Sequence, residues 1–174
     1  IFYPPQAFGQ SNLDLAMQLA ARVRELTPAA ARITEYYAGV GAIGLGLAET
    51  AASLRLNELG EGSVAGLTRG VAALPEAARV KVMLNVGAAG EHAALVADSD
   101  FVIADPPRKG LDAELVSALR QTPPKRFAYV SCDIDSFERD AAQLLEAFRL
   151  TTLEAYDLFP HTEHLETLAV FEPR

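Results

Sequence analysis

The stretch Glu35-Tyr36-Tyr37-Ala38-Gly39-Val40-Gly41-Ala42-Ile43-Gly44 decides the fold class. Its glycines satisfy the pattern G-x-G-x-x-G, which here follows a strand-like run and precedes a stretch with helical spacing. At such a turn the bare backbone lets a ligand approach closely. The alternative is tight packing without a ligand. The stretch therefore predicts the first β-α unit of a nucleotide-binding α/β domain.

Strand-like and helical segments alternate on both sides of this turn. Such alternation predicts βαβ units, and therefore a parallel sheet covered by helices on both faces. The predicted strands cover 33–37, 53–57, 80–84, 101–104 and 127–130, and the predicted helices cover 13–26, 43–52, 63–74, 91–97, 113–120 and 136–148.

The C-terminal part of the sequence departs from this alternation. Two strand-like runs, 151–158 and 164–171, are joined only by Phe159-Pro160-His161-Thr162-Glu163. A parallel crossover needs about a dozen residues or more, so these two strands are predicted to pair antiparallel. The predicted fold class is α/β: a Rossmann-like, mostly parallel seven-stranded sheet with a C-terminal antiparallel hairpin.

Composition narrows the class of protein. Half of the 174 residues are hydrophobic and 22% are charged, which suits one packed domain. No stretch approaches the roughly 20 apolar residues of a membrane span, and the start at Ile1 does not resemble a signal peptide. A single cysteine, Cys132, excludes an internal disulfide and a cysteine-built metal site, so we expect no metal and a cytoplasmic location.

The charge balance bears on possible partners. Fifteen Lys and Arg residues against 23 Asp and Glu residues give a net charge of −8. A domain that grips nucleic acid by itself normally has a basic face. The balance alone favours a small-molecule site, and nucleic-acid binding would require a further segment or basic residues gathered around one cleft.

Two carboxylates distinguish the ligands that the glycine turn can hold. Glu58 follows Gly39 by 19 residues, at the end of the second predicted strand, where it can bind the ribose hydroxyls of NAD or of S-adenosylmethionine. Glu35 precedes the turn, where its charge would repel the pyrophosphate of NAD. An acid attracts the ammonium and sulfonium groups of S-adenosylmethionine instead. The pattern therefore favours S-adenosylmethionine.

Three further residues are predicted at the same edge of the sheet. Asp105 begins the loop Asp105-Pro106-Pro107-Arg108-Lys109-Gly110 after the fourth predicted strand, where ligands of open α/β sheets bind. Cys132 follows the fifth predicted strand and precedes a helix, whose N-terminus favours the thiolate. Glu166 lies on an apolar face of the last predicted strand, where desolvation raises its pKa toward that of a base. The alternatives are a rigid turn, a core cysteine and a solvated glutamate.

Together these motifs resemble the S-adenosylmethionine-dependent RNA uracil-5 methyltransferases, which make 5-methyluridine in tRNA and rRNA. The resemblance covers essentially the whole chain, 1–174, as that family's C-terminal catalytic domain of class I methyltransferase fold, and it implies a separate N-terminal RNA-binding part. The matching stretches are Phe8-Gly9-Gln10-Ser11-Asn12, Glu35-Tyr36-Tyr37-Ala38-Gly39-Val40-Gly41, Asp105-Pro106-Pro107-Arg108, Ser131-Cys132-Asp133 and Phe159-Pro160-His161-Thr162-Glu163-His164-Leu165-Glu166.

The resemblance implies a role for individual residues. Cys132 is expected to attack C6 of a uracil, and Glu166 is expected to remove the C5 proton. The substrate implied is tRNA or rRNA, with Asp133, His161 and His164 as candidates for orienting the base. The expected contacts to S-adenosyl-L-methionine come from Gln10, Tyr37, Glu58 and Asp105, beside Gly39 and Gly41 of the turn.

The sequence also departs from the family pattern, and two other functions compete. Ala38 stands where cysteine is common, Ala42 where a polar residue is frequent, and no acidic residue lies near Gly87-Ala88-Ala89 to face an adenine. One rival is a cytosine-5 methyltransferase, but its nucleophile is expected near the loop after the fourth strand, and Asp105-Pro106-Pro107 offers no cysteine. The other rival is a cofactor- and RNA-binding module without turnover.

Overall fold

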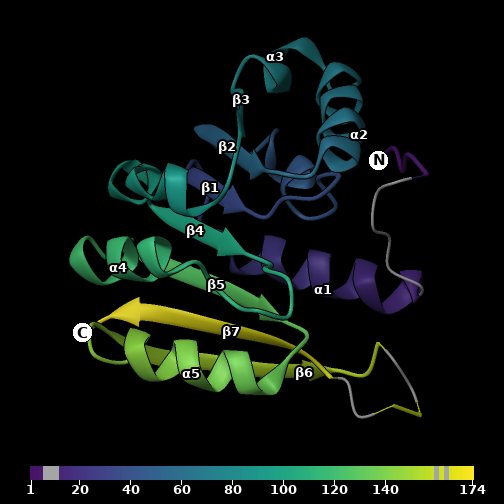
Figure 1. Cartoon of the computed structure of the whole chain (residues 1–174). Helices are drawn as coiled ribbons and strands as arrows, with labels where there is room; N and C mark the ends of the chain where they lie inside the picture. Colours follow the sequence, from purple (N-terminus) through teal and green to yellow (C-terminus); the bar gives the residue numbers. More distant parts are fainter. Residues whose placement is uncertain (6–11, 159–160, 163–164) are drawn as a thin grey trace.

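Seven strands form one sheet in the computed structural model, which describes residues 1–5, 12–158, 161–162 and 165–174 (Figure 1). The strands are β1 (Arg32–Tyr36), β2 (Ser53–Glu58), β3 (Val82–Val86), β4 (Phe101–Ala104), β5 (Arg126–Ser131), β6 (Phe148–Tyr156) and β7 (Glu166–Pro173). Their order is β3-β2-β1-β4-β5-β7-β6, and β1 to β5 run parallel. Strand β7 runs antiparallel to β5 and β6, which confirms the predicted fold class.

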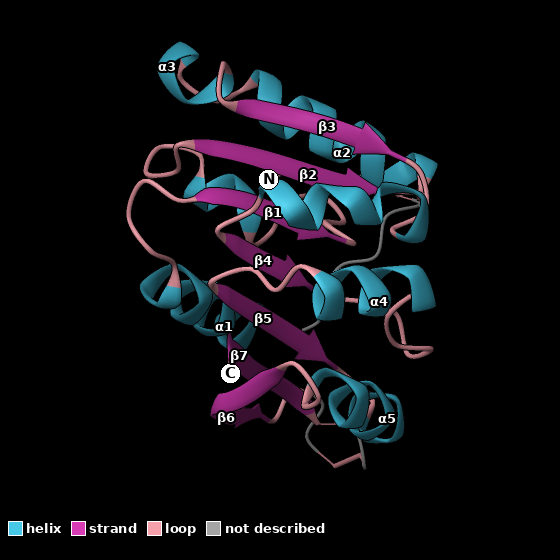
Figure 2. Ribbon diagram, turned by 90° about the vertical axis from the view of Figure 1, so that its left-hand side faces the viewer, coloured by secondary structure: helices cyan, strands magenta, loops and turns pink. Residues whose placement is uncertain are grey.

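Helices cover both faces of this sheet. Helix α1 covers one face, and α4 and α5 cover the other (Figure 2). The helical elements are α1 (Leu13–Leu26), η1 (Gly44–Leu47), α2 (Glu61–Ala72), α3 (Glu76–Arg79), η2 (Gly90–Asp98), α4 (Ala113–Gln121) and α5 (Ile134–Leu144), of which η1 and η2 are 3₁₀ helices. Within the described part of the chain, every helix is too short or too polar to span a lipid bilayer.

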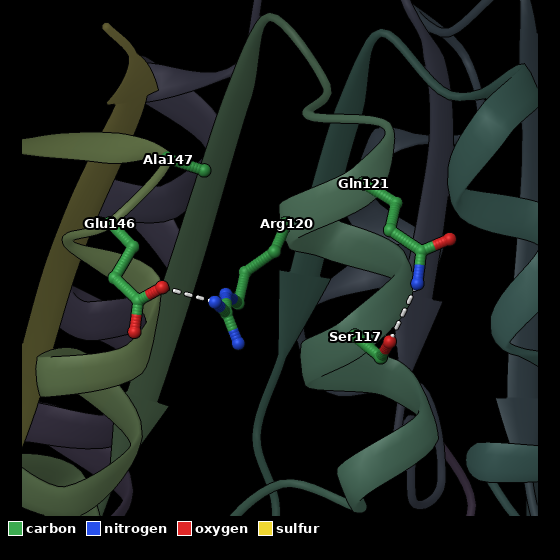
Figure 3. A pocket seen from close by; sticks show the side chains of 5 residues that line it. All are labelled: Ser117, Arg120, Gln121, Glu146 and Ala147. Atoms are coloured by element: carbon green, nitrogen blue, oxygen red, sulfur yellow. Dashed lines mark hydrogen bonds and ion pairs between the residues drawn. The ribbon is translucent and has the colours of Figure 1, made fainter.

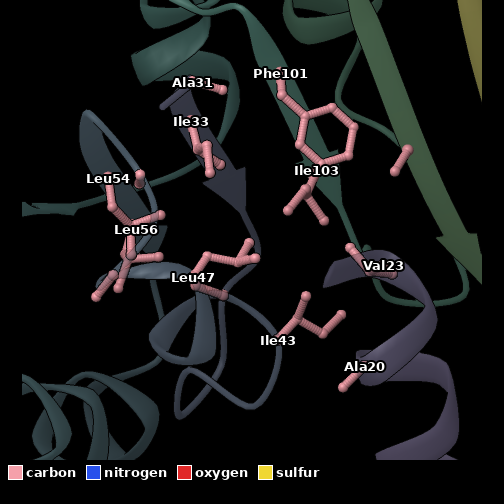
Figure 4. Packing of buried hydrophobic residues seen from close by; sticks show 14 of the residues in the cluster. Ala20, Val23, Ala31, Ile33, Ile43, Leu47, Leu54, Leu56, Phe101 and Ile103 are labelled. Carbon is pink, nitrogen blue, oxygen red and sulfur yellow. The ribbon is translucent and has the colours of Figure 1, made fainter. Parts of the chain in front are cut away.

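Two apolar clusters fix the central strands. On the α1 face, Val23 packs with Phe101 and Ile103 of β4 (Figure 4). On the other face, Tyr129 of β5 packs with residues of α4 and α5. Strand β4 is buried along its whole length, as expected for a parallel strand covered on both sides. The core therefore holds the carboxyl ends of β1, β4 and β5 at one edge, where the candidate site lies.

The predicted helix over 43–52 is wrong, because only the short 3₁₀ helix η1 forms there. Gly44 and Gly46 weaken an α-helix in this stretch. Gly44 also lies against the Glu35 carboxyl group, since a Cβ atom on Gly44 would fall 1.9 Å from Glu35 Oε2. The backbone here is therefore shaped by close packing around Glu35. The short helix α3, which precedes β3, was absent from the sequence prediction.

The C-terminal hairpin places β7 beside β5. Its second strand, β7, inserts between β5 and β6, so the last strand of the chain becomes the neighbour of β5. The ladder between them ends with Ser131 opposite Thr167, where Thr167 Oγ1 donates a hydrogen bond to the Ser131 carbonyl oxygen at 3.2 Å. This register brings the residues that follow β5 beside the residues that begin β7.

Candidate functional site

The glycine turn after β1 is tied to the end of β2 by the carboxylate of Glu58. Gly39 N donates to Glu58 Oε2 at 2.7 Å, and Gly60 N donates to Glu58 Oε1 at 2.6 Å. Gly39 and Gly41 both have positive φ values, of 57° and 85°. The second lone pair of each Glu58 oxygen remains available to a further donor. The turn therefore presents a fixed carboxylate at the edge of the sheet.

Tyr37 joins this turn to the loop after β4. Its hydroxyl oxygen accepts a hydrogen bond from Asp112 N at 3.0 Å, and its side chain is half-buried. Burial raises the pKa of the Tyr37 hydroxyl, so the group stays protonated at neutral pH. The predicted cofactor contact is thus a side chain whose hydroxyl also holds a neighbouring loop.

Glu35 is a buried acid just before the turn. Its side chain is 1% exposed, and Glu35 Oε2 has no hydrogen-bond partner among the described residues. Burial, aided by the negative charges of Asp105 and Glu58, raises its pKa to about 8, and the Gly44 amide opposes part of that rise. A buried carboxyl oxygen without a partner is costly. A cation at this edge would satisfy Glu35.

Cys132 and Glu166 come together through the register of β5 and β7. They are the next residues after the paired Ser131 and Thr167, so they lie opposite one another. Glu166 is 1% exposed, Cys132 is half-buried, and Glu166 Oε2 has no hydrogen-bond partner within the described ranges. Desolvation raises the pKa of Glu166 to about 7. The Cys132 thiol and the Glu166 carboxyl group, whose pKa lies near neutral pH, therefore face the same space.

Asp105 belongs to the same group. It follows β4, which pairs with β5, and burial together with the charge of Glu166 raises its pKa to about 8. The pKa of Cys132 is raised too, first by burial and then by Glu166 and Asp105, while Arg108 opposes the rise. The three groups are thus close enough to influence one another's ionisation. This arrangement places two carboxyl groups beside one thiol.

The predicted activation of Cys132 by the helix that follows it is not what the structure shows. Asp133 is the N-cap of α5 and accepts from Ser136 N at 2.9 Å, so the helix begins directly after the cysteine. Burial and the two carboxyl groups nevertheless outweigh the opposing effects of Arg108 and of a backbone hydrogen bond at Cys132, and the thiol pKa rises. Burial, and the carboxyl groups when they are ionised, therefore disfavour the thiolate.

Other predicted residues are placed less tightly or lie outside the described residues. Gln10 and His164 fall outside them, and His161 is exposed with a φ of 70°. Lys109 pairs with Asp112 at 2.7 Å. The exposed Arg108, from the same loop, is the residue whose positive charge lowers the pKa of Cys132.

One acidic residue near the loop after β3 was missed from the sequence. The loop Gly87-Ala88-Ala89 contains no acid, but Glu91 in η2 folds back so that its Oε2 accepts from Ala88 N at 3.2 Å. The i to i+3 spacing of Ala88 and Glu91 at the start of a helix is the signal that was available. The Glu91 carboxylate therefore lies beside this loop.

A surface hollow at the opposite end of the sheet is not part of this group. It lies between the end of α4 and the turn before β6, and is lined by Ser117, Arg120, Gln121, Glu146 and Ala147 (Figure 3). Arg120 pairs with Glu146, and Gln121 donates to Ser117. The polar side chains of this hollow therefore form their ion pair and hydrogen bond with one another. Among the residues that the structure describes, no group of three or more His, Cys, Asp or Glu side chains is arranged to hold a metal ion.

The raised pKa values predict how stability depends on pH. Glu35 and Asp105, with pKa values of about 8, and Glu166, with about 7, hold protons in the folded state that the unfolded chain releases near pH 4. The folded state therefore binds more protons between these limits, and the free energy of unfolding is expected to fall as pH rises from 5 to 8. Urea unfolding at several pH values measures this. Glu166→Gln should flatten the curve between pH 5 and 7, and a stability that rises with pH would contradict the assignment.

Comparisons with known proteins show which proteins this chain resembles in sequence. The family model for tRNA (uracil-5-)-methyltransferases matches residues 96–173. An uncharacterized RNA methyltransferase of Protochlamydia amoebophila is 36% identical over 173 residues, which cover 99% of this chain and 45% of that protein. The tRNA (uracil(54)-C(5))-methyltransferase of Pyrococcus abyssi is 34% identical over 165 residues, covering 95% and 38%. The 23S rRNA (uracil(747)-C(5))-methyltransferase of Edwardsiella ictaluri is 30% identical over 173 residues, covering 98% and 45%. The chain thus spans less than half the length of these relatives.

Solved structures give the same result for the fold. The crystal structure of the Pyrococcus abyssi tRNA (uracil-54, C5)-methyltransferase in complex with S-adenosyl-L-homocysteine matches with a TM-score of 0.84 and 34% identity, covering 96% of this chain and 40% of that one. The glycopeptide N-methyltransferase MtfA, at 14% identity and a TM-score of 0.65, shares only the class I methyltransferase fold. In sequence and in fold, the chain is therefore homologous to the RNA uracil-5 methyltransferases, as its motifs predict.

Proposed function

We propose that residues 1–174 form the catalytic domain of an S-adenosylmethionine-dependent enzyme that methylates C5 of a uridine in tRNA or rRNA. The observation that carries the proposal is that Cys132 and Glu166 lie opposite one another just beyond the last pair of the β5–β7 ladder, beside Asp105. A nucleophile and a base close to one another are what C5 methylation of a pyrimidine requires. The homology to uracil-5 methyltransferases supports the same chemistry.

The chain's acids suit a cationic cofactor. Glu35 Oε2 is buried without a hydrogen-bond partner among the described residues, which fits the positive ammonium and sulfonium groups of S-adenosylmethionine. Glu58 is held by two backbone amides and keeps lone pairs for ribose hydroxyls. When bound, the cofactor supplies a methyl group as an electrophile. Its contacts to Gln10, Tyr37, Gly39, Gly41 and Asp105 are part of the proposal.

Cys132 performs the first step in the proposed mechanism. Carbon C5 of uracil is a weak nucleophile, so the Cys132 thiolate adds to C6, forms a sulfur–carbon bond and pushes electrons onto the C4 carbonyl oxygen. The resulting enolate makes C5 nucleophilic enough to accept the methyl group. The Glu166 carboxylate then takes the proton from C5. The electron pair of that C–H bond re-forms the C5–C6 double bond, and the thiolate leaves from C6.

Burial and electrostatics explain why the Cys132 thiol is expected to stay protonated before the cofactor binds. Burial first, and then Glu166 and Asp105, raise the pKa of Cys132, so the thiolate is disfavoured, most strongly when those carboxyl groups are ionised. A bound cation would offset the contribution of the ionised carboxyl groups. The nucleophile is therefore expected to gain reactivity when the positively charged cofactor is present, which links cysteine activation to loading of the site.

Glu58→Gln is expected to weaken cofactor binding by about tenfold, because one charge-assisted hydrogen bond is lost and the new amide N–H faces a backbone N–H donor. Titration calorimetry with S-adenosylhomocysteine measures the effect. Glu61→Gln, an exposed acid in the first turn of α2, is the matched control and should bind like the wild type. Equal affinities for wild type and Glu58→Gln would remove Glu58 from the proposed ribose site.

The function is tested by methyl transfer to RNA. The intact protein is incubated with isotopically labelled S-adenosylmethionine and with tRNA or rRNA from cells that lack its gene, and the RNA is digested to nucleosides for mass spectrometry. Labelled 5-methyluridine is the expected product, and Cys132→Ala should give none. Labelled 5-methylcytidine would instead support the cytosine enzyme, and cofactor binding without label in any RNA would support a binding module.

A further inference from the structure

A buried carboxylate outside the proposed catalytic pair joins three elements near the site. Asp140 lies on the inner side of α5 and is 1% exposed. Its Oδ2 accepts from Leu111 N at 2.8 Å and from the Tyr129 hydroxyl at 2.9 Å. Its Oδ1 accepts from Arg139 Nε at 3.0 Å and from Arg139 Nη2 at 2.9 Å. Asp140 therefore connects α5, strand β5 and the segment 105–112, which we call the Asp105 loop.

Arg139 holds the same loop from outside. Its Nη2 also donates to the Lys109 carbonyl oxygen at 2.7 Å, while its side chain is 54% exposed. Between Lys109 and Leu111 the loop passes over the Arg139–Asp140 pair at Gly110, which has a φ of 82°. A Cβ atom there would lie 2.4 Å from Asp140 Oδ2, so only glycine allows this approach. The loop is therefore seated on the Arg139–Asp140 pair.

The two ends of the Asp105 loop are held by other contacts. Asp112 N donates to the Tyr37 hydroxyl at 3.0 Å, and Asp112 Oδ2 accepts from Gly90 N at 3.1 Å. Its first residue, Asp105, continues directly from β4. The position of the middle of the loop thus depends on the Arg139–Asp140 pair. Through Tyr129, the same carboxylate is fixed to β5, the strand that leads to Cys132.

We propose that Asp140 and Arg139 are positioning residues that hold the Asp105 loop against the middle of α5, and with it the separation of Asp105 from Cys132. This inference rests on the proposed function, since it assigns Asp105 to the cofactor and Cys132 to the uracil. A charge-assisted hydrogen bond buried from water is strong and directional. The pair therefore determines where the loop lies, although neither residue touches a reacting atom.

The test compares Arg139→Ala with Arg149→Ala. Arg149 is a matched control, because it is also exposed and also pairs with a carboxylate, Glu172, at 3.0 Å, far from the loop. In the intact protein, Arg139→Ala is expected to speed hydrogen exchange of the Asp105 loop and to raise the KM for S-adenosylmethionine about tenfold, the scale of one lost charge-assisted hydrogen bond. The KM for RNA should stay within about twofold.

A second variant addresses the carboxylate itself. Asp140→Asn keeps the shape but turns an amide N–H toward the Arg139 guanidinium, so the pair separates. It should reproduce the Arg139→Ala effects on loop exchange and cofactor KM, with the exchange of β4 and β5 unchanged.

Two results would overturn the proposal: loop exchange that is unchanged in Arg139→Ala, or faster loop exchange with an unchanged cofactor KM. A merely structural role would lower the melting temperature or kcat without moving that KM. Failure of the proposed function is recognised separately, because a wild-type protein that methylates no RNA would refute that function. Hydrogen exchange of the Asp105 loop in Arg139→Ala tests the seating of the loop in either case.

Discussion

Cys132→Ser is expected to abolish methyl transfer, lowering kcat by about 10⁴-fold or more, the scale seen when a catalytic nucleophile is removed. Serine keeps nearly the same volume at the end of β5, but its hydroxyl ionises far less readily than a thiol and cannot add to C6 at a useful rate. The carboxyl groups of Glu166 and Asp105, which already raise the pKa of the thiol, would disfavour an alkoxide even more. Rates are measured as labelled 5-methyluridine formed from RNA.

Binding separates this loss from a damaged fold. The cysteine is half-buried and does not pair in the sheet, so Cys132→Ser should unfold at the same urea concentration as the wild type. Its affinity for S-adenosylhomocysteine should also match the wild type. A Cys132→Ser protein with a tenth or more of wild-type turnover would show that the reaction does not pass through this sulfur.

Glu166→Gln is expected to stop the reaction after methyl transfer. Without a carboxylate beside Cys132, the C5 proton stays in place and the cysteine cannot leave from C6, so a covalent protein–RNA complex accumulates with ordinary RNA. Turnover should fall by about 10³-fold, within the range for loss of a general base. Denaturing gels detect the complex. Glu172→Gln, at the other end of β7, is the matched control, because Glu172 pairs with Arg126 and Arg149 away from the site.

The pH dependence of the elimination step follows from the same residue. Burial raises the pKa of Glu166 to about 7, so the carboxyl group is protonated below that pH and ionised above it. Only the ionised form accepts a proton, and the rate of product release from the adduct is expected to rise through pH 7 and then level off. Glu166→Gln should lack this rise. Rapid release from the Glu166→Gln adduct at any pH would exclude Glu166 as the base.

Much of the fold was predictable because the signals are local. Alternating strand-like and helical runs gave the parallel sheet, and the short link after 158 gave the antiparallel hairpin, as the structure confirms. The spacing of Gly39 and Glu58 placed a carboxylate beside the turn, and a hydrogen bond of 2.7 Å joins them. These features depend on residues near one another in sequence or on the general geometry of βαβ units.

The remaining features depend on long-range packing. No local pattern says that β7 inserts between β5 and β6 in the register that sets Glu166 opposite Cys132. The rise in the pKa of Cys132 comes first from burial and then from carboxyl groups at two other strands, so the helix that follows Cys132 misled the prediction. Asp140 had one available signal, a charged residue on the apolar stripe of a helix, but its partners Leu111 and Tyr129 come from distant segments.

Covalent trapping with 5-fluorouridine-substituted RNA tests the central claim most directly. Fluorine at C5 cannot be removed as a proton by Glu166, so the intact protein with S-adenosylmethionine should form a stable adduct. Peptide mass spectrometry should locate that adduct on Cys132, carrying the RNA nucleotide and one added methyl group. An adduct on any other residue, or active 5-methyluridine synthesis without any adduct on Cys132, would contradict the account.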